Sequence, residues 1–138
     1  MTTTAISEQQ LIEMGQAAQA ASRELVRHPT QARNQALINI ADGLRSRRDE
    51  VLAANEQDRR AGERDGLSDA SLDRLLLDAD RLEGLADDVR SVAALPDPVG
   101  QTSELGVRPN GLRVGKRRVP LGVIGAIYES RPNVTIDF

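Results

Sequence analysis

The residues whose types and spacing could do chemistry lie in one short segment near the end of the chain. Glu129-Ser-Arg-Pro-Asn133 combines a carboxyl group, a guanidinium group and a side-chain amide. Arg131 can hold a carboxylate or a phosphate through two parallel hydrogen bonds, and Asn133 can donate its amide N–H to a developing oxyanion. A structural interpretation is also open, and the residue types alone favour it: Arg131 lies on the surface, Pro132 ends a strand and Asn133 caps the next helix.

The composition excludes several other kinds of catalytic site. The chain has 138 residues, no cysteine and a single histidine, His28. Thiolate catalysis, Cys/His zinc sites and a catalytic triad built within these residues are therefore excluded, and no metal site is predicted. The segment Gly111–Lys116 resembles a phosphate-binding loop only superficially, because it has one residue too few between its glycines and is followed by Arg117 instead of Ser or Thr.

Charge and hydropathy indicate which partners to expect. The net charge is −3, and the basic residues of the first 95 positions are interleaved with acidic ones, while aromatic residues that stack on bases are nearly absent. The N-terminus lacks the basic and apolar regions of a signal peptide, and no apolar run approaches the roughly 18 residues of a membrane span. We therefore expect a cytoplasmic protein that has neither a nucleic-acid nor a membrane partner.

Consecutive amphipathic helices are predicted over residues 1–95. Apolar residues recur at spacings of three and four, which is the period of one helical face. The first such stripe consists of Leu11, Met14, Ala18, Ala21 and Leu25. The candidate N-caps of the successive helices are Ser7, Thr30, Ser46, and Asp78 or Asp80, and Ser68 and Ser71 are expected to start short turns. Pro96 is predicted to end the last helix.

A β-hairpin and then a buried strand are predicted after Pro96. Residues 100–107 and 112–119 alternate weakly between apolar and polar types, and Arg108-Pro-Asn-Gly111 has the composition of a tight turn. The next residues, 119–127, are apolar throughout, which is typical of a strand buried on both faces of a parallel sheet. A parallel neighbour needs a crossover of about a dozen residues. Only 11 residues follow Ile127, so we expect the sequence to cover only part of a domain.

Longer motifs carry a resemblance to a known family. The run Arg117–Thr135 closely resembles the N-terminal region of the γ-glutamyl phosphate reductases, also called glutamate-5-semialdehyde dehydrogenases, of the aldehyde dehydrogenase superfamily. Four earlier segments agree with that family in order and spacing, namely 54–58, 66–75, 81–90 and 97–100. The resemblance covers nearly the whole chain, but family members are much longer, so only their N-terminal portion is matched.

The resemblance implies an α/β fold in three parts. Residues 1–95 are expected to be a helical segment of the cofactor domain, and residues 96–119 a β-hairpin oligomerisation arm. Residues 120–138 are expected to form the first buried strand and loop of an incomplete Rossmann-like, dinucleotide-binding sheet of the aldehyde dehydrogenase type.

The resemblance also implies an oxidoreductase of proline biosynthesis. In that family, NADPH reduces L-glutamyl 5-phosphate to L-glutamate 5-semialdehyde through a thioester on a cysteine. Asn133 resembles the catalytic asparagine that polarises the carbonyl oxygen, Arg131 is expected to bind substrate, and Ile127, Tyr128 and Glu129 are expected to lie at the cofactor.

Two functions remain open at this stage. Because the chain lacks the catalytic cysteine, the first is an N-terminal part of the reductase that is inactive alone and forms homo-oligomers through the hairpin at 100–119. The alternative is a standalone interaction module that pairs with full-length subunits through the same hairpin. Both functions require that arm, so the sequence does not separate them.

Overall fold

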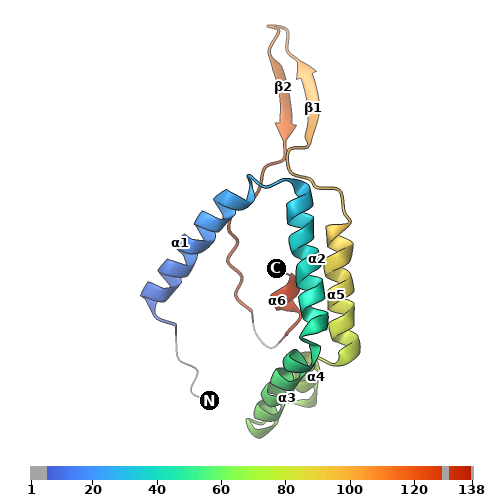
Figure 1. Ribbon diagram of the computed structural model, residues 1–138. Coiled ribbons are helices and arrows are strands. Elements are labelled where there is room, and N and C mark those ends of the chain that lie inside the picture. Colours follow the sequence, from blue (N-terminus) through green and yellow to red (C-terminus); the bar gives the residue numbers. More distant parts are fainter. Residues whose placement is uncertain (1–5, 129–130, 138) are drawn as a thin grey trace. The chain divides into compact units, whose positions relative to one another are not determined.

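The computed structural model describes residues 6–128 and 131–137 (Figure 1). The chain divides into two compact units, of which the first comprises residues 1–30 and 96–124 and the second residues 31–95 and 125–138. The division at 95, 119 and 138 inferred from the sequence stays a prediction. Each unit is described by itself.

The first unit contains helix α1 (Glu8–Leu25). A capping box fixes the start of α1, as predicted for Ser7: the Ser7 hydroxyl accepts from the Gln10 backbone N–H at 3.2 Å, and Gln10 Oε1 accepts from the Ser7 backbone N–H at 2.8 Å. No residue of α1 is buried. The apolar stripe that predicted this helix therefore remains exposed, with Leu11 and Met14 among its members.

A two-stranded antiparallel hairpin, β1 (Thr102–Val107) and β2 (Arg113–Arg117), completes the regular structure of the first unit. Its turn is closed by hydrogen bonds from Arg108 N to Leu112 O and from Gly111 N to Arg108 O, both 2.8 Å. Gly111 has a φ of +82°, a conformation that glycine adopts without steric cost. The predicted hairpin and turn are confirmed, and every residue of both strands is exposed.

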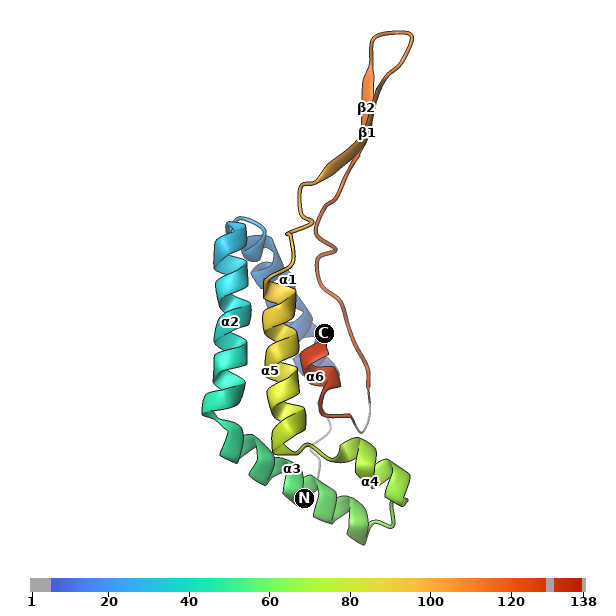
Figure 2. The same cartoon turned by 90° about the vertical axis from the view of Figure 1, so that its right-hand side faces the viewer.

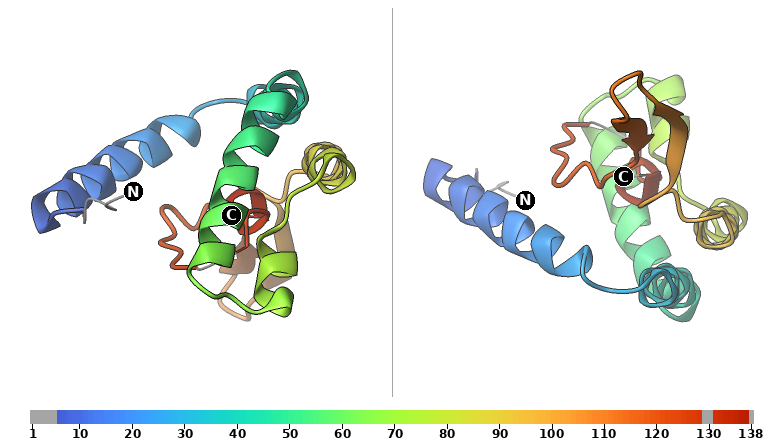
Figure 3. Two further views of the ribbon diagram at one scale, coloured as in Figure 1. Left: turned by 90° about the horizontal axis from the view of Figure 1, so that it is seen from below. Right: turned by 90° about the horizontal axis from the view of Figure 1, so that it is seen from above.

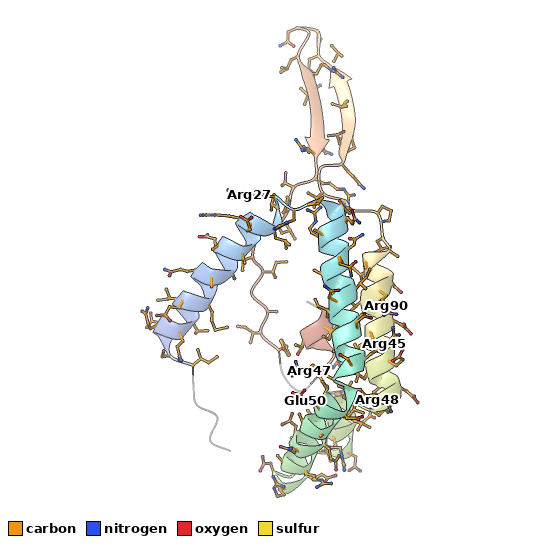
Figure 4. The ribbon with its side chains drawn as sticks, in the orientation of Figure 1. Arg27, Arg45, Arg47, Arg48, Glu50 and Arg90 are labelled. Carbon is orange, nitrogen blue, oxygen red and sulfur yellow. The ribbon has the colours of Figure 1, made fainter. Side chains whose placement is uncertain are left out.

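Helices α2 (Thr30–Ser46), α3 (Arg48–Arg64), α4 (Asp69–Leu75), α5 (Ala79–Ala93) and α6 (Val134–Asp137) build the second unit. Helices α2 and α5 lie side by side, and α3 and α4 lie across one end of the pair (Figure 2 and Figure 3). Small side chains fill the contact between α2 and α5, where Ala41, Ala86 and Val89 form one buried cluster. Ion pairs flank it, from Arg45 to Glu83 and Asp87 and from Arg90 to Asp42. Figure 4 labels the two arginines.

A second buried cluster, Leu77, Leu82 and Leu85, joins the start of α5 to α3, whose Val51 and Leu52 pack against it. Ile136 of α6 packs against both clusters. The short helix α6 is therefore held in place by one apolar side chain that contacts both parts of the core.

Two of the predicted helix caps are side-chain caps, and two are not. Asp78 accepts a hydrogen bond from the backbone three residues on, like Ser7. Ser68, where only the start of a short turn is predicted, caps the helix α4 in the same way. Thr30 is instead the first residue of α2, and its hydroxyl donates to Asp97 at 2.6 Å. The prediction for Ser46 is wrong: it is the last residue of α2, and Arg47 precedes α3 without a side-chain cap bond. The Arg47 backbone (φ −105°, ψ 20°) lacks the extended conformation that a cap residue usually adopts.

The expected burial of the strand at 119–127 is wrong in this structure. The residues form no strand, and Leu121 is 87 % exposed. A strand buried on both faces needs neighbours on both edges, and among residues 6–128 and 131–137 the hairpin strands pair only with each other. The helical segment and the hairpin of the predicted fold class are confirmed; the strand lacks the sheet that would bury it.

The exposure of residues 119–127 predicts self-association of the chain. Apolar surface with unpaired backbone groups is a template for pairing with another chain. Sedimentation should show oligomers that grow with concentration. The double variant Leu121→Ser/Ile127→Ser should shift them towards monomer, whereas Met14→Ser, at an exposed apolar site on α1, should not. A monodisperse monomer with a sharp, cooperative thermal transition would contradict this prediction.

Within the described part of the chain, no helix is long and apolar enough to cross a bilayer. The same residues hold no group of three or more His, Cys, Asp or Glu side chains that could bind a metal ion.

Candidate functional site

The predicted site residues that the structure describes lie in one segment of the second unit. Tyr128 and Arg131 are exposed, and Asn133 is half-buried directly before α6. Ile127 is fully exposed, so its side chain is open to a partner or ligand. Glu129, predicted at the cofactor, lies outside the described residues.

Two contacts anchor the segment that carries Arg131 and Asn133. The hydroxyl groups of Tyr128 and Thr135 share a hydrogen bond of 2.7 Å, which joins the two sides of the loop. On the far side, Ile136 packs into the helical core. Ile136 thereby attaches α6 to the core of the second unit, and Tyr128 is bonded to α6 through Thr135.

Asn133 occupies the N-cap position of α6, since its carbonyl accepts from Ile136 N at 2.8 Å and Asp137 N at 3.1 Å. Its side chain does not cap the helix in the usual way. The Asn133 amide nitrogen donates to the exposed Asp137 carboxylate at 3.2 Å, instead of the amide oxygen accepting from helix backbone. The backbone of Asn133 thus takes the helix-cap position that the structural interpretation predicts. Its side-chain amide does not cap the helix and acts as a hydrogen-bond donor.

An apolar pocket of about 530 Å³ is lined by residues of α2, α3, α4, the α4–α5 connection, α5 and α6. Leucines and other apolar residues form most of its wall, including Leu44, Val51, Leu75, Leu82 and Ile136. Tyr128, Arg131 and Glu50 also line it. A hydrogen bond from Arg47 lowers the pKa of the Glu50 carboxyl below its ordinary value, so Glu50 is ionised at neutral pH.

Asn55 is an important residue of this pocket that the sequence analysis did not single out. It is buried, its Nδ2 donates to Leu75 O at 2.8 Å, and its Oδ1 accepts from Leu77 N at 2.8 Å. These two bonds tie the α4–α5 connection to α3. The available signal was a polar residue four positions after Val51, on the face of the helix that faces the core.

Replacing Asn55 with leucine should lower the free energy of unfolding of the second unit by about 2–3 kcal/mol. The substitution leaves the Leu75 carbonyl and the buried Leu77 N–H without partners, and leucine cannot replace either bond. Urea unfolding followed by circular dichroism measures the change. Asn39→Leu, at an exposed amide on α2, is the control and should shift stability by less than about 0.5 kcal/mol. Equal effects of the two substitutions would show that the Asn55 bonds contribute little.

A second, polar pocket of about 390 Å³ lies beside the apolar one. Its charged and amide side chains are Asp73, Arg74, Arg81, Asp88, Arg131 and Asn133. The structure therefore brings the two sequence-predicted residues of the loop, Arg131 and Asn133, to one cavity. Tyr128 lines only the apolar pocket, and Ile127 lines neither.

Arg81 stabilises the wall of the polar pocket through hydrogen bonds to neighbouring residues. Its guanidinium donates to the carbonyls of Asp73 and Leu76 at 2.7 and 2.8 Å and to the Asp73 carboxylate at 2.9 Å. Asp73 and Arg81 thus neutralise each other. Arg74, Asp88 and Arg131 are exposed and make no ion pair across residues 6–128 and 131–137, which leaves their charges available to a ligand.

Comparison with known proteins confirms the resemblance seen in the sequence. No family model matches the chain. It is 54 % identical over 127 residues to a protein of Erwinia tasmaniensis named gamma-glutamyl phosphate reductase, and 54 % identical over 124 residues to one of the same name from Photobacterium profundum. These matches cover 92 % and 90 % of this chain and 30 % of each relative. The chain thus spans about a third of the length of the relatives that it matches.

Solved structures agree with the sequence comparison. The crystal structure of gamma-glutamyl phosphate reductase from Thermotoga maritima matches with a TM-score of 0.85 at 39 % identity, over 91 % of this chain and 30 % of that one. The Saccharomyces cerevisiae protein of the same name matches with a TM-score of 0.85 at 30 % identity, over 96 % of this chain and 33 % of that one. The helices and hairpin described above therefore match part of this α/β fold.

Proposed function

We propose that this chain is the N-terminal part of a γ-glutamyl phosphate reductase and that it contributes substrate-binding and carbonyl-polarising groups to the active site. The reaction converts L-glutamyl 5-phosphate, NADPH and a proton into L-glutamate 5-semialdehyde, phosphate and NADP⁺. One observation carries the proposal: a chain 54 % identical to proteins of that name brings Arg131 and Asn133 to one polar pocket.

In this proposal Asn133 acts on the carbonyl oxygen of the acyl group. That oxygen gains negative charge when a nucleophile adds to the carbonyl carbon and forms a tetrahedral intermediate. The Asn133 amide, whose present acceptor is the exposed Asp137 carboxylate, would donate to it instead. Because the charge exists only near the transition state, this hydrogen bond lowers the barrier more than it tightens substrate binding.

Arg131 supplies charge next to that amide. It is exposed, makes no ion pair within the described ranges, precedes Asn133 by two positions of sequence and lines the same pocket. A guanidinium group can hold two oxygens of a phosphate through parallel N–H donors. Arg131 would therefore orient the substrate for attack and stabilise the departing phosphate.

The nucleophile comes from outside these 138 residues, since they include no cysteine. Family members use a cysteine to form a thioester with release of phosphate, and the thioester carbonyl then accepts a hydride. We place that cysteine in the part of the reductase that corresponds to the remaining length of the relatives.

The chemistry of Ile127 and Tyr128 fits a place beside the cofactor. Both side chains are exposed, and a flat aromatic group together with an aliphatic one suits the face of a nicotinamide ring. NADPH would supply the hydride when bound. Among the described residues, Arg131 is the basic residue nearest in sequence to Ile127 and Tyr128.

Complementation of a proline auxotroph tests the proposed function. The 127 matched residues of the Erwinia tasmaniensis relative are replaced by the corresponding residues of this chain, and the chimeric gene is expressed in a bacterium that lacks its own reductase. Growth without proline is the expected result. A chimera that is produced in soluble form at the level of the parent protein but never restores growth would contradict the proposal.

The exposed hairpin favours an additional role in assembly. All residues of β1 and β2 are exposed, and within the described ranges each strand pairs only with the other, so the outer edge of each is unpaired. We propose that the hairpin joins subunits into a homo-oligomer by pairing or packing with another subunit. Adding the chain to a full-length relative should then change that relative's sedimentation, whether the chain is a segment of the reductase or a standalone module. An unchanged sedimentation profile at every dilution would contradict pairing through the hairpin.

A further inference from the structure

We propose that the polar pocket binds the α-amino acid end of the substrate, with Arg74 holding the α-carboxylate and Asp88 the α-ammonium group. This inference rests on the proposed function and adds two specificity-determining residues to it. Arg74 comes from α4 and Asp88 from α5, so the pair is contributed by elements other than the loop that carries Arg131 and Asn133.

The charges in the pocket match a zwitterion. Asp73 is paired with Arg81, which leaves Arg74, Arg131 and Asp88 without ion-pair partners in the part of the chain that the structure describes. A simple anion would gain from the two arginines but would be repelled by Asp88. An α-amino acid instead presents a carboxylate and an ammonium group together, and satisfies both signs of charge.

The bonding of the substrate decides which arginine holds which group. In an acyl phosphate the phosphate is attached to the same carbon that carries the carbonyl oxygen. Arg131 is only two residues from Asn133 in one short loop, so the group beside Asn133 is the phosphate. The α-carboxylate lies at the opposite end of the glutamyl chain, and Arg74 is the remaining guanidinium of the pocket that is not bound to an acid.

The position of Arg74 is fixed by contacts on both sides. Arg81 binds the carbonyls of Asp73 and Leu76, and Asn55 binds the backbone of Leu75 and Leu77. The backbone around Arg74 is thus held by hydrogen bonds from both α5 and α3. The pocket volume of about 390 Å³ also lies in the range of about 300–1,000 Å³ that is usual for small-molecule sites.

Kinetics of the chimera in the reverse direction test the assignment, because phosphate and glutamate 5-semialdehyde are then separate substrates. Arg74→Ala should raise the KM for the semialdehyde about 10- to 100-fold and leave the KM for phosphate within about twofold. Asp88→Asn should raise the same KM by about tenfold. Arg48→Ala, an exposed arginine at the start of α3 and outside the pocket, should change neither.

The possible outcomes separate this inference from the proposed function. An active chimera in which Arg74→Ala leaves the KM for the semialdehyde unchanged overturns the inference alone. An increase in the KM for phosphate would instead place Arg74 at the phosphate and also overturn it. An inactive, folded chimera would contradict the proposed function.

Ligand binding to the 138-residue chain gives a readout without turnover. In NMR titrations, L-glutamate should shift the Arg74 side-chain Nε–H resonance, and N-acetyl-L-glutamate, which lacks the ammonium group, should bind at least tenfold more weakly. Asp88→Asn should remove that preference for the free amino group. Equal affinity of the two compounds, or shifts confined to other arginines, would overturn the inference.

Discussion

Asn133→Ala in the complete reductase should lower kcat by about 100-fold and change KM little, because removing one oxyanion donor costs on this scale. The structure places this amide at the wall of the polar pocket, where its nitrogen donates to the exposed Asp137 carboxylate and to no other described residue. Alanine keeps the backbone bonds that begin α6 but has no group to donate to the carbonyl oxygen. Steady-state kinetics of the chimera measure the effect.

Arg131→Ala in the same protein is the informative companion. If Arg131 holds the phosphate equally well in the ground state and the transition state, its loss raises the KM for phosphate in the reverse reaction more than it lowers kcat.

A different outcome for Asn133→Ala, with kcat unchanged and only the melting temperature lowered, would show that Asn133 is a helix cap and nothing more.

The chain on its own should show no reductase turnover, the second large effect that we expect. Its 138 residues contain no cysteine to form the thioester. The assay follows NADP⁺ reduction in the presence of glutamate 5-semialdehyde and phosphate, with the chimera as positive control. Turnover by the chain after purification from a host that lacks the reductase would overturn this prediction.

Local patterns were enough to predict the helices and the hairpin. Ser7, Ser68 and Asp78 cap helices as their residue types suggest, and Pro109 to Gly111 form the expected turn. Ser46 failed as a cap because α3 follows α2 after a single intervening residue, so the chain never becomes extended there. Cap prediction depends on the backbone of the cap residue as well as on its side chain.

Features that depend on contacts between distant residues were harder to predict from the sequence. The apolar run at 119–127 has the composition of a buried strand, but burial depends on neighbours that local composition does not supply, and the run is exposed here. Likewise, Arg131 and Asn133 could be singled out from their types, whereas Arg74 and Asp88 could not. Their meeting in one pocket depends on how α4 and α5 pack, and helix-surface charges are usually only solvated.

The chimera's own kinetics test the central claim most directly. The Erwinia tasmaniensis relative, with its matched 127 residues replaced by those of this chain, is purified and assayed for NADP⁺ reduction with glutamate 5-semialdehyde and phosphate. We expect a kcat within about tenfold of the parent enzyme, a barrier change of no more than about 1.4 kcal/mol. A folded chimera with the parent's oligomeric state but no measurable turnover would contradict the claim that this chain supplies part of a reductase active site.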